Sequence, residues 1–189
     1  MAKRPTFALL RTNFPYKAAA AGPGGALVKS NKELVKLIGG RLEKSLAAIY
    51  PDLDAMNACA IRLSYCLNKS GYKVGVVKGV RIYAGADLFN YTISADEMIT
   101  YMKSVFGKPV KIWDGNKAAG KQWLAAVKLP TQGIFGYDWQ GRIADFGASG
   151  HVDIGKLTES GGQPFISEFG TNQYFLAGPM IVYFWECSL

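Results

Sequence analysis

The sequence predicts an α+β fold in which N-terminal helices pack on an antiparallel β-sheet. Up to Pro109 the apolar residues recur at helical spacing behind capping residues, whereas short β-like runs separated by Gly, Pro, Asn and Asp follow. Helices that precede strands, rather than alternate with them, favour an antiparallel sheet. The 189 residues, of which 49% are apolar, suit one globular domain, so we expect residues 1–189 to form a single domain.

The first long helical region is expected to begin at residue 30, after a loop or loosely ordered arm over residues 14–29. Ser30 and Glu33 form a capping box, in which the serine accepts from an early helical amide and the glutamate reaches back. Gly39 and Gly40 interrupt the helix, and close packing against another backbone would explain them. The apolar face is predicted to comprise Leu34, Val35, Leu37, Ile38 and Leu42.

Two further helices carry clear start and stop signals. Asn57 is a suitable N-cap for a helix over residues 58–68, and Gly71 suits the left-handed stop that follows. A second capping box, Ser94-Ala-Asp-Glu97, opens a helix that ends before Gly107. Its apolar face is predicted to comprise Met98, Ile99, Met102, Val105 and Phe106.

The region after Pro109 holds short runs rich in β-branched and aromatic residues, which predict strands. Turn residues separate the runs, and no internal repeat is present. The predicted strands cover residues 110–113, 124–129, 133–139, 142–146, 151–154 and 174–185.

The net charge of +8 is explained by a solvated basic surface or by an anionic partner, such as nucleic acid, a membrane surface or cell wall. The basic residues are scattered and no nucleic-acid-binding motif occurs, so we expect no nucleic-acid partner. No apolar run reaches the roughly 18–20 residues that span a bilayer. The short apolar run Phe7–Leu10 does not match a secretory signal, so we expect a protein that is not membrane-embedded and is made in the cytoplasm without a signal peptide.

The sequence predicts no metal and no cofactor. A single histidine excludes sites built from several histidines, and no CxxC pair is present. Cys59 and Cys66 would lie roughly 10 Å apart on one helix, which is too far for a disulfide. The sequence does not decide between a free Cys187 and a disulfide from Cys187 to either of them.

Cys59 is the candidate nucleophile, because it falls in the first turn of the predicted helix over 58–68. Free amides and the positive end of the helix dipole favour a thiolate there, as in papain-like amidases. The alternative is an inert buried cysteine, which we expect Cys66 to be. Arg62, almost one turn after Cys59, is expected to form a buried ion pair that braces the helix.

His151 is the candidate general base, because it begins a strand that follows the helix-start cysteine in the chain. This is the papain order, in which a histidine deprotonates the cysteine and a third group orients the imidazole ring. Gly150 would leave room beside the ring.

Two acids are candidates for the third residue. A hairpin turn at Gly155-Lys156 would place Glu159 opposite His151. Asp153 shares the strand face of His151 but would lie about 7 Å along the strand. The third possibility is that neither acid contacts the ring.

Several segments together resemble the fourth family of type VI secretion amidase effectors, which are papain-like (NlpC/P60-like) peptidoglycan endopeptidases. The most specific is the run Asn57-Ala-Cys-Ala-Ile-Arg-Leu-Ser-Tyr-Cys-Leu-Asn68, and the likeness covers roughly residues 4–155. The remaining matching segments are Arg4-Pro-Thr-Phe7, Ile38-Gly-Gly40, Gly71-Tyr72, Gly85-Ala-Asp87, Phe106-Gly-Lys-Pro109 and Gly150-His-Val152.

The resemblance implies that Cys59 is the nucleophile, that His151 is its base, and that Glu159-Ser160 stands where the family has its third catalytic residue, an aspartate. It implies cleavage of the amide between D-glutamate and diaminopimelate in peptidoglycan stem peptides. The implied partners are the type VI secretion machinery and a periplasmic immunity protein of the producer, and the implied place of action is the periplasm of a target cell. The alternatives are a non-catalytic cell-wall-binding module on the same fold, or a papain-like amidase with another peptide substrate.

Overall fold

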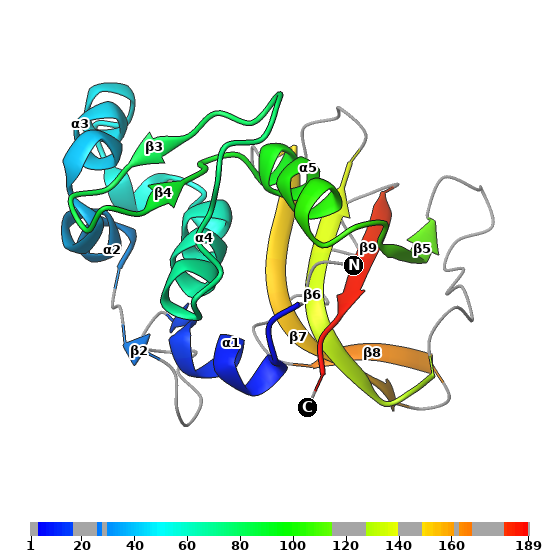
Figure 1. Cartoon of the computed structure of the whole chain (residues 1–189). Coiled ribbons are helices and arrows are strands. Elements are labelled where there is room, and N and C mark those ends of the chain that lie inside the picture. Colours follow the sequence, from blue (N-terminus) through cyan, green and yellow to red (C-terminus); the bar gives the residue numbers. More distant parts are fainter. Residues whose placement is uncertain are drawn as a thin grey trace.

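The computed structural model describes residues 4–16, 26–27, 30–114, 128–139, 149–160, 163–167 and 180–188. Within this part of the chain the helices precede the main sheet, and Figure 1 shows them on one side of it, with α4 beside β7. The helices are α1 (Phe7–Asn13), α2 (Asn31–Ile38), α3 (Gly40–Ile49), the short 3-10 helix η2 (Leu53–Ala55), α4 (Cys59–Lys69) and α5 (Ala95–Val105).

The main sheet of the described residues is antiparallel and has the strand order β5-β9-β6-β7-β8. Its strands are β5 (Val110–Asp114), β6 (Thr131–Asp138), β7 (Gly150–Ser160), β8 (Gln163–Ser167) and β9 (Ile181–Glu186). The predicted α+β class with an antiparallel sheet is therefore confirmed. Two small pairs accompany it: β1 (Pro15–Tyr16) with β2 (Ala26–Leu27), and β3 (Tyr83–Ala84) with β4 (Asn90–Tyr91).

Several sequence predictions need correction or fall outside the described residues. The predicted strand over 151–154 is longer, because β7 continues to Ser160. Residues 128 and 129 are not in a strand, and residues 124–127, 142–146 and 174–179 lie outside the described part. In the predicted arm over 14–29, residues 15–16 and 26–27 form a small parallel pair, and residues 17–25 and 28–29 are not described.

The predicted caps form as the local sequence requires. The hydroxyl of Ser30 accepts from the Glu33 amide at 3.1 Å, and that of Ser94 accepts from the Glu97 amide at 3.5 Å. Gly71 has a φ of 83° after α4. Leu37, however, is 60% exposed, so it does not belong to the buried face of α2.

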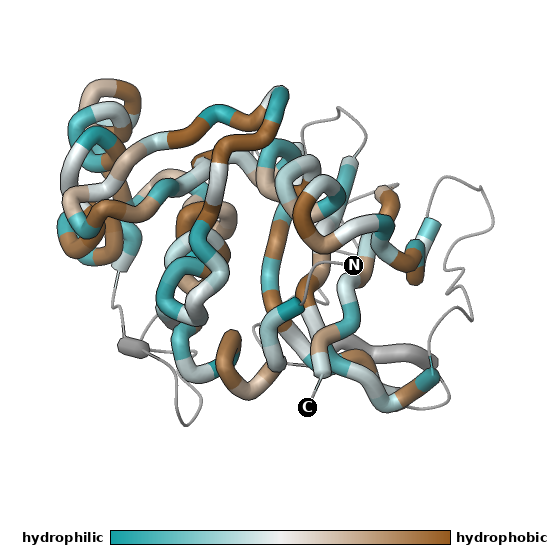
Figure 2. Tube along the Cα trace, viewed as in Figure 1, coloured by the Kyte–Doolittle hydropathy of each residue, from teal (hydrophilic) through white to brown (hydrophobic). Residues whose placement is uncertain are grey.

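The core has an apolar cluster on each face of the main sheet and a third among the N-terminal helices. On one face Val152 and Ile154 of β7 pack with Leu63 of α4, and on the other Tyr137 and Phe135 of β6 pack with neighbouring strands. The third cluster joins α2, α3 and α4. Apolar residues recur along α4, α5 and the central strands (Figure 2), and this packing fixes α4 against β7.

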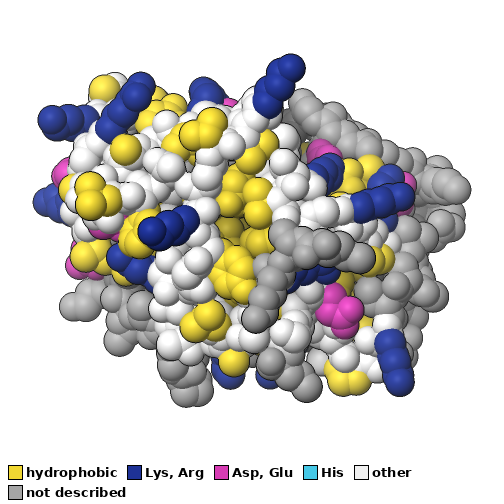
Figure 3. Space-filling view, in the orientation of Figure 1, with side chains coloured by type: hydrophobic (Ala, Val, Ile, Leu, Met, Phe, Trp, Pro, Cys, Tyr) yellow, Lys and Arg dark blue, Asp and Glu magenta, His cyan; other side chains and the backbone are white. Residues whose placement is uncertain are grey.

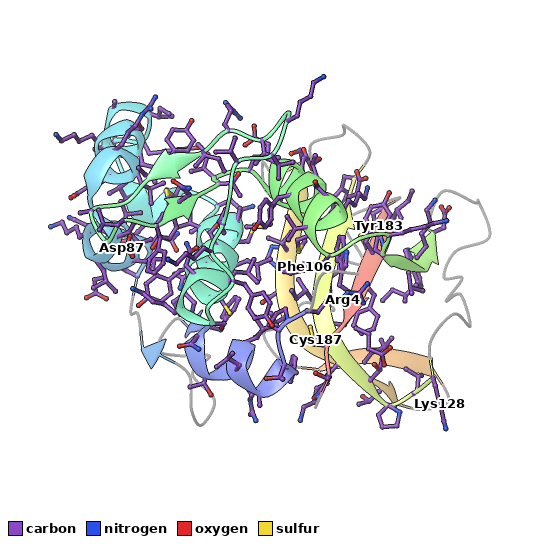
Figure 4. The ribbon with its side chains drawn as sticks, in the orientation of Figure 1. Arg4, Asp87, Phe106, Lys128, Tyr183 and Cys187 are labelled. Carbon is purple, nitrogen blue, oxygen red and sulfur yellow. The ribbon has the colours of Figure 1, made fainter. Side chains whose placement is uncertain are left out.

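The two ends of the described chain are tied together. The Phe7 amide donates to the carbonyl of Ser188 at 2.9 Å. The Arg4 guanidinium, which lies near Phe106 and Cys187 in Figure 4, donates to the carbonyl oxygens of Phe106 at 3.2 Å and Glu186 at 3.2 Å. Arg4 thereby joins the end of α5 to the end of β9.

Gly40→Ala is expected to destabilise the protein by about 2–5 kcal/mol. Gly40 has a φ of 70°, and an added Cβ would lie 2.5 Å from the backbone nitrogen of Ala86. Gly71→Ala is the matched control, because Gly71 has a φ of 83° with nothing within 4 Å of an added Cβ. It should lose only about 1 kcal/mol, the cost of the left-handed backbone. Urea unfolding measures both, and equal losses would contradict the predicted close packing.

Candidate active site

Cys59 is the first residue of α4, the helix that packs beside β7. The predicted N-cap is wrong by one residue, because α4 begins at Cys59 and its N-cap is Ala58, which makes no side-chain cap bond. The side chain of Asn57 still accepts from the Cys59 amide at 3.5 Å. Cys59 therefore sits where the helix dipole and unpaired amides favour a negative charge. Its side chain belongs to the rim of the core, and the residue is 8% exposed.

His151 is the second residue of β7, on the part of that strand that β8 does not pair. The register places it opposite Tyr137 of β6, and the two rings lie 5.6 Å apart between centroids. An added Cβ at Gly150 would lie 2.8 Å from a carboxylate oxygen of Asp96, so the glycine lets α5 approach the start of β7. His151 is 8% exposed, and no histidine surface is visible on the face in Figure 3.

Asp153 lies two residues after His151 on the same face of β7, and its side chain reaches the imidazole ring. The Oδ2 atom of Asp153 is 3.5 Å from Nε2 of His151. The other carboxylate oxygen accepts from the Ile154 amide at 2.8 Å, which fixes the rotamer. Nε2 is therefore the ring nitrogen that faces Asp153.

The Cys59 side chain lies close enough to the buried imidazole of His151 for its charge to act on that ring. Burial alone lowers the pKa of His151, but a negative charge on Cys59 and the hydrogen bond to Asp153 outweigh it and raise the pKa to about 9. This environment stabilises an imidazolium beside a thiolate. The arrangement can deprotonate Cys59 and hold the proton on His151 for later donation.

The carboxylate of Asp153 is 6% exposed, and burial is the largest influence on it. Burial raises the pKa of Asp153, whereas the hydrogen bond and charge of His151, the Ile154 amide and the charge of Arg62 lower it. These three partners offset only part of the desolvation cost, so the pKa of Asp153 stays above its usual value.

Glu159 is not brought to His151, and the hairpin predicted at Gly155-Lys156 is wrong. Gly155 lies inside β7, where it pairs with Gly133 of β6, and Glu159 pairs with Pro164 of β8. Glu159 is thus roughly 26 Å along the strand from His151. Gly133, the partner of Gly155, allows close strand packing, since an added Cβ there would meet the carbonyl of Trp185.

Arg62 braces the site through neutral partners rather than through the direct ion pair expected from the sequence. Its Nη2 donates to Oδ1 of Asn31 at 2.8 Å, and its Nη1 donates to the carbonyl of Pro15. Sequence reasoning missed Asn31, because nothing local signals a contact between residues so far apart. Tyr137 was also missed, although pairing the runs 133–139 and 151–154 as a hairpin would have placed it beside His151.

The other two cysteines do not share the environment of Cys59. All three are free and buried, so the bridge left open for Cys187 does not form. Burial raises the pKa of Cys187 to about 12 and that of Cys66 well above its usual value. Both thiols therefore stay protonated near neutral pH, and Cys66 donates to the carbonyl of Leu10 at 3.2 Å.

A cavity of about 700 Å³ lies elsewhere, at the start of β6 and the end of β9. Its lining includes Arg4, Thr131, Lys156, Glu186 and Cys187, but neither Cys59 nor His151. This cavity is therefore separate from the reactive side chains.

Comparison with known proteins identifies the class of protein that carries this site. The family model described as type VI secretion system amidase effector protein 4, Tae4, matches residues 55–184, which is more than half of the chain. The chain is thus of the class of secreted effectors with amidase activity, which are hydrolases. It belongs to the Tae4 family. No match is found among curated protein sequences.

Solved structures share the fold of this chain. The type VI effector Tae4 from Enterobacter cloacae is 23% identical with a TM-score of 0.63, and the match covers 99% of each chain. The effector Tae4 from Salmonella typhimurium, in complex with the immunity protein Tai4 from Enterobacter cloacae, is 23% identical with a TM-score of 0.65 over 97% of this chain and 99% of that one. In the described part of this chain, none of the helices is long and apolar enough to cross a membrane.

Proposed function

We propose that this chain is a cysteine amidase of a papain-like (NlpC/P60-like) fold that hydrolyses peptidoglycan stem peptides between D-glutamate and diaminopimelate. The observation that carries the proposal is that Cys59, at the start of α4, acts electrostatically on buried His151, whose Nε2 lies 3.5 Å from the Asp153 carboxylate. The chain's amidase family supports the reaction class. The substrate follows from the family resemblance, and the net charge of +8 suits an anionic wall.

The reaction begins with transfer of the thiol proton of Cys59 to His151. The thiolate attacks the γ-carbonyl carbon of D-glutamate, and backbone amides at the start of α4, including that of Cys59, stabilise the oxyanion. The hydrogen bond that the Cys59 amide donates to Oδ1 of Asn57 is long, at 3.5 Å, so substrate can replace it. The carbon–nitrogen bond then breaks, and His151 protonates the departing amine of diaminopimelate.

Water completes the cycle by attacking the thioester between Cys59 and D-glutamate. His151 accepts a proton from that water and returns one to the thiolate as the free γ-carboxylate leaves. Asp153 keeps the ring oriented throughout, because its carboxylate is anchored by the Ile154 amide. The mechanism uses only side chains that the fold already brings together.

In the cell, the proposed course is export by the type VI machinery and action in the periplasm of a target cell. Solved relatives are complexes with the immunity protein Tai4. A cognate immunity protein in the producer's periplasm is the corresponding partner proposed for this chain.

The deciding experiment is digestion of purified Gram-negative muropeptides, with products read by mass spectrometry. Fragments split between D-glutamate and diaminopimelate, which the wild-type chain forms and Cys59→Ala does not, are expected. Intact muropeptides together with rapid alkylation of Cys59 would point to another peptide substrate. Intact muropeptides without such alkylation would point to a non-catalytic wall-binding module.

The cleavage rate is expected to fall above about pH 9, because the pKa of His151 is about 9 and the leaving amine needs a proton from the imidazolium. Above that pH, kcat/KM should drop roughly tenfold per unit. Alkylation of Cys59 by iodoacetamide needs only the thiolate, so its rate should not drop with it. If the cleavage rate and the alkylation rate declined together above pH 9, the protein would instead be unfolding.

Protonation of His151 also makes the stability of the folded protein depend on pH. Its folded-state pKa of about 9 lies above the unfolded value of about 6.5. The resulting stabilisation is therefore complete below about pH 6.5 and is lost as the pH rises through 9. The pH profile of activity should be measured where thermal melting still shows a folded protein.

Asp153→Ala is expected to reduce kcat by roughly 10²-fold or more, because the imidazole loses the group that orients it. Glu159→Ala is the matched control on the same strand and should retain kcat within about twofold, since its backbone lies far from His151. Steady-state kinetics on one muropeptide compare the two variants. A larger loss in Glu159→Ala would restore the sequence-based assignment of the third residue.

A further inference from the structure

Arg62 places a buried positive charge next to the reactive pair. It lies almost one turn after Cys59 on α4 and is only 7% exposed. Its direct partners are neutral, namely the side chain of Asn31 and the carbonyl of Pro15. A buried guanidinium with neutral partners costs free energy unless nearby negative charges compensate it.

Those negative charges are the ones of the reactive site. Burial lowers the pKa of Arg62, and the charges of Asp153, Cys59 and Asp54 act against that effect. Among the described residues, Arg62 and His151 are the cations whose charges lower the pKa of Asp153. Asp54 belongs to the exposed helix η2 and accepts from the Lys32 amide at 3.0 Å, so it is not part of the buried set.

The charges of the active form of the site sum to zero only with Arg62. The thiolate of Cys59 and the carboxylate of Asp153 carry two negative charges, and the imidazolium of His151 and the guanidinium of Arg62 carry two positive ones. Without Arg62 the buried group would hold one uncompensated negative charge. Such a site takes up a proton, so either the thiolate or the carboxylate would be lost.

We propose that Arg62 is a positioning residue for the reaction, whose charge keeps Cys59 and Asp153 ionised together while His151 is protonated. The proposal rests on the proposed function only in taking Cys59 and His151 as the reactive pair. This role is distinct from bracing. By bracing we mean that the hydrogen bonds of the guanidinium hold neighbouring segments in place.

The other titratable groups around the site do not supply this charge. Cys66 of α4 keeps its proton, because burial raises its pKa well above the usual value. Tyr137 of β6 offers a neutral phenol 5.6 Å from the imidazole between ring centroids. Asp96 of α5, which accepts from the Ser149 hydroxyl at 2.6 Å beside Gly150, adds a negative charge rather than a positive one.

Bracing and charge can be separated by substitution. The side chain of Asn31 donates to the carbonyl of Met56 at 2.8 Å, so Arg62 and Asn31 together hold the segment just before Cys59. Arg62→Lys keeps the charge but loses the guanidinium fork. Arg62→Gln loses the charge but keeps an amide donor for Asn31. Asn31→Ala leaves the charge and removes the acceptor.

The test is the pH profile of Cys59 alkylation by iodoacetamide, with Cys59→Ala as the background. In Arg62→Gln the profile should move upward by about one pH unit or more, so that the rate at neutral pH falls about tenfold or more. In Arg62→Lys and in Asn31→Ala the profile should stay in place, although the melting temperature falls. The acidic limb of kcat/KM on muropeptides should move in parallel with the alkylation profile.

A double variant keeps the test decisive even where Arg62→Gln folds poorly. In Arg62→Gln/Asp153→Asn the charges of the thiolate and imidazolium balance again. Its alkylation profile should return toward that of the wild type, and its melting temperature should exceed that of Arg62→Gln.

Equal alkylation profiles for Arg62→Gln and Arg62→Lys, or a double variant no better than Arg62→Gln, would overturn the proposal and leave bracing alone. These readouts need no peptidoglycan. A failure of the proposed substrate therefore appears in the muropeptide digestion and not in the alkylation profile.

Discussion

Cys59→Ala is expected to abolish cleavage of muropeptides, with a loss of roughly 10⁴-fold or more in kcat, because no other group of the site can form the thioester. The substitution should leave the melting temperature nearly unchanged. Cys59 lies at the rim of the core at the start of α4, where an alanine fits without creating a large void. Steady-state kinetics and thermal melting of the purified variant measure both effects.

Cys66→Ala is the matched control, because it removes a thiol from the same helix. Cys66 is fully buried and donates to the carbonyl of Leu10. Its loss should cost about 1–2 kcal/mol of stability and little of kcat. If Cys66→Ala were inactive while Cys59→Ala still turned over substrate, the assignment of the nucleophile would be reversed.

His151→Ala is expected to reduce kcat by at least about 10³-fold, because both the deprotonation of Cys59 and the protonation of the leaving amine depend on the imidazole. Unlike Cys59→Ala, it should also lower stability. His151 lies against the ring of Tyr137 and is a hydrogen-bond partner of Asp153. Its removal leaves a void beside Tyr137 and a buried carboxylate with one partner fewer.

The pH dependence of that destabilisation is a direct check. Burial already raises the pKa of Asp153, and losing His151 removes the largest opposing influence. The ionised carboxylate is therefore less stable in the variant than in the wild type. The stabilisation that the wild type gains from its protonated imidazole is present at pH 7 and is lost as the pH rises through about 9. The melting temperature of His151→Ala should therefore lie closer to that of the wild type at pH 10 than at pH 7. Near-normal turnover in this variant would exclude the proposed pair.

The parts of the fold that were predictable from the sequence are those set by short-range chemistry. The caps at Ser30 and Ser94 follow from hydroxyls that accept from the amides of Glu33 and Glu97, three residues further on. The order of Cys59 and His151 along the chain, with a helix before a strand, was enough to suggest these two residues as a pair.

The parts that failed depend on long-range register. Gly155 has the local character of a turn residue, but the pairing of β7 with β6 keeps it inside a strand opposite Gly133. Glu159 was misplaced for that reason alone. Asp153 looked too distant for a direct contact, yet its rotamer, fixed by the Ile154 amide, brings the carboxylate to the ring. The network of Arg62 and Asn31 joins segments whose proximity only the packed structure reveals.

The place of the last strand in the sheet has a consequence for when the protein gains its structure. β9 (Ile181–Glu186) is last in the chain but lies between β5 and β6, and residues just after it bond to Phe7. Until those C-terminal residues are available, β6 and β5 each present an unpaired edge, which is prone to sticking to other chains. Most of these pairings are distant in sequence, and such topologies fold slowly. The sheet therefore cannot close before β9 has left the ribosome, and until then the facing edges of β5 and β6 are open to chaperone binding.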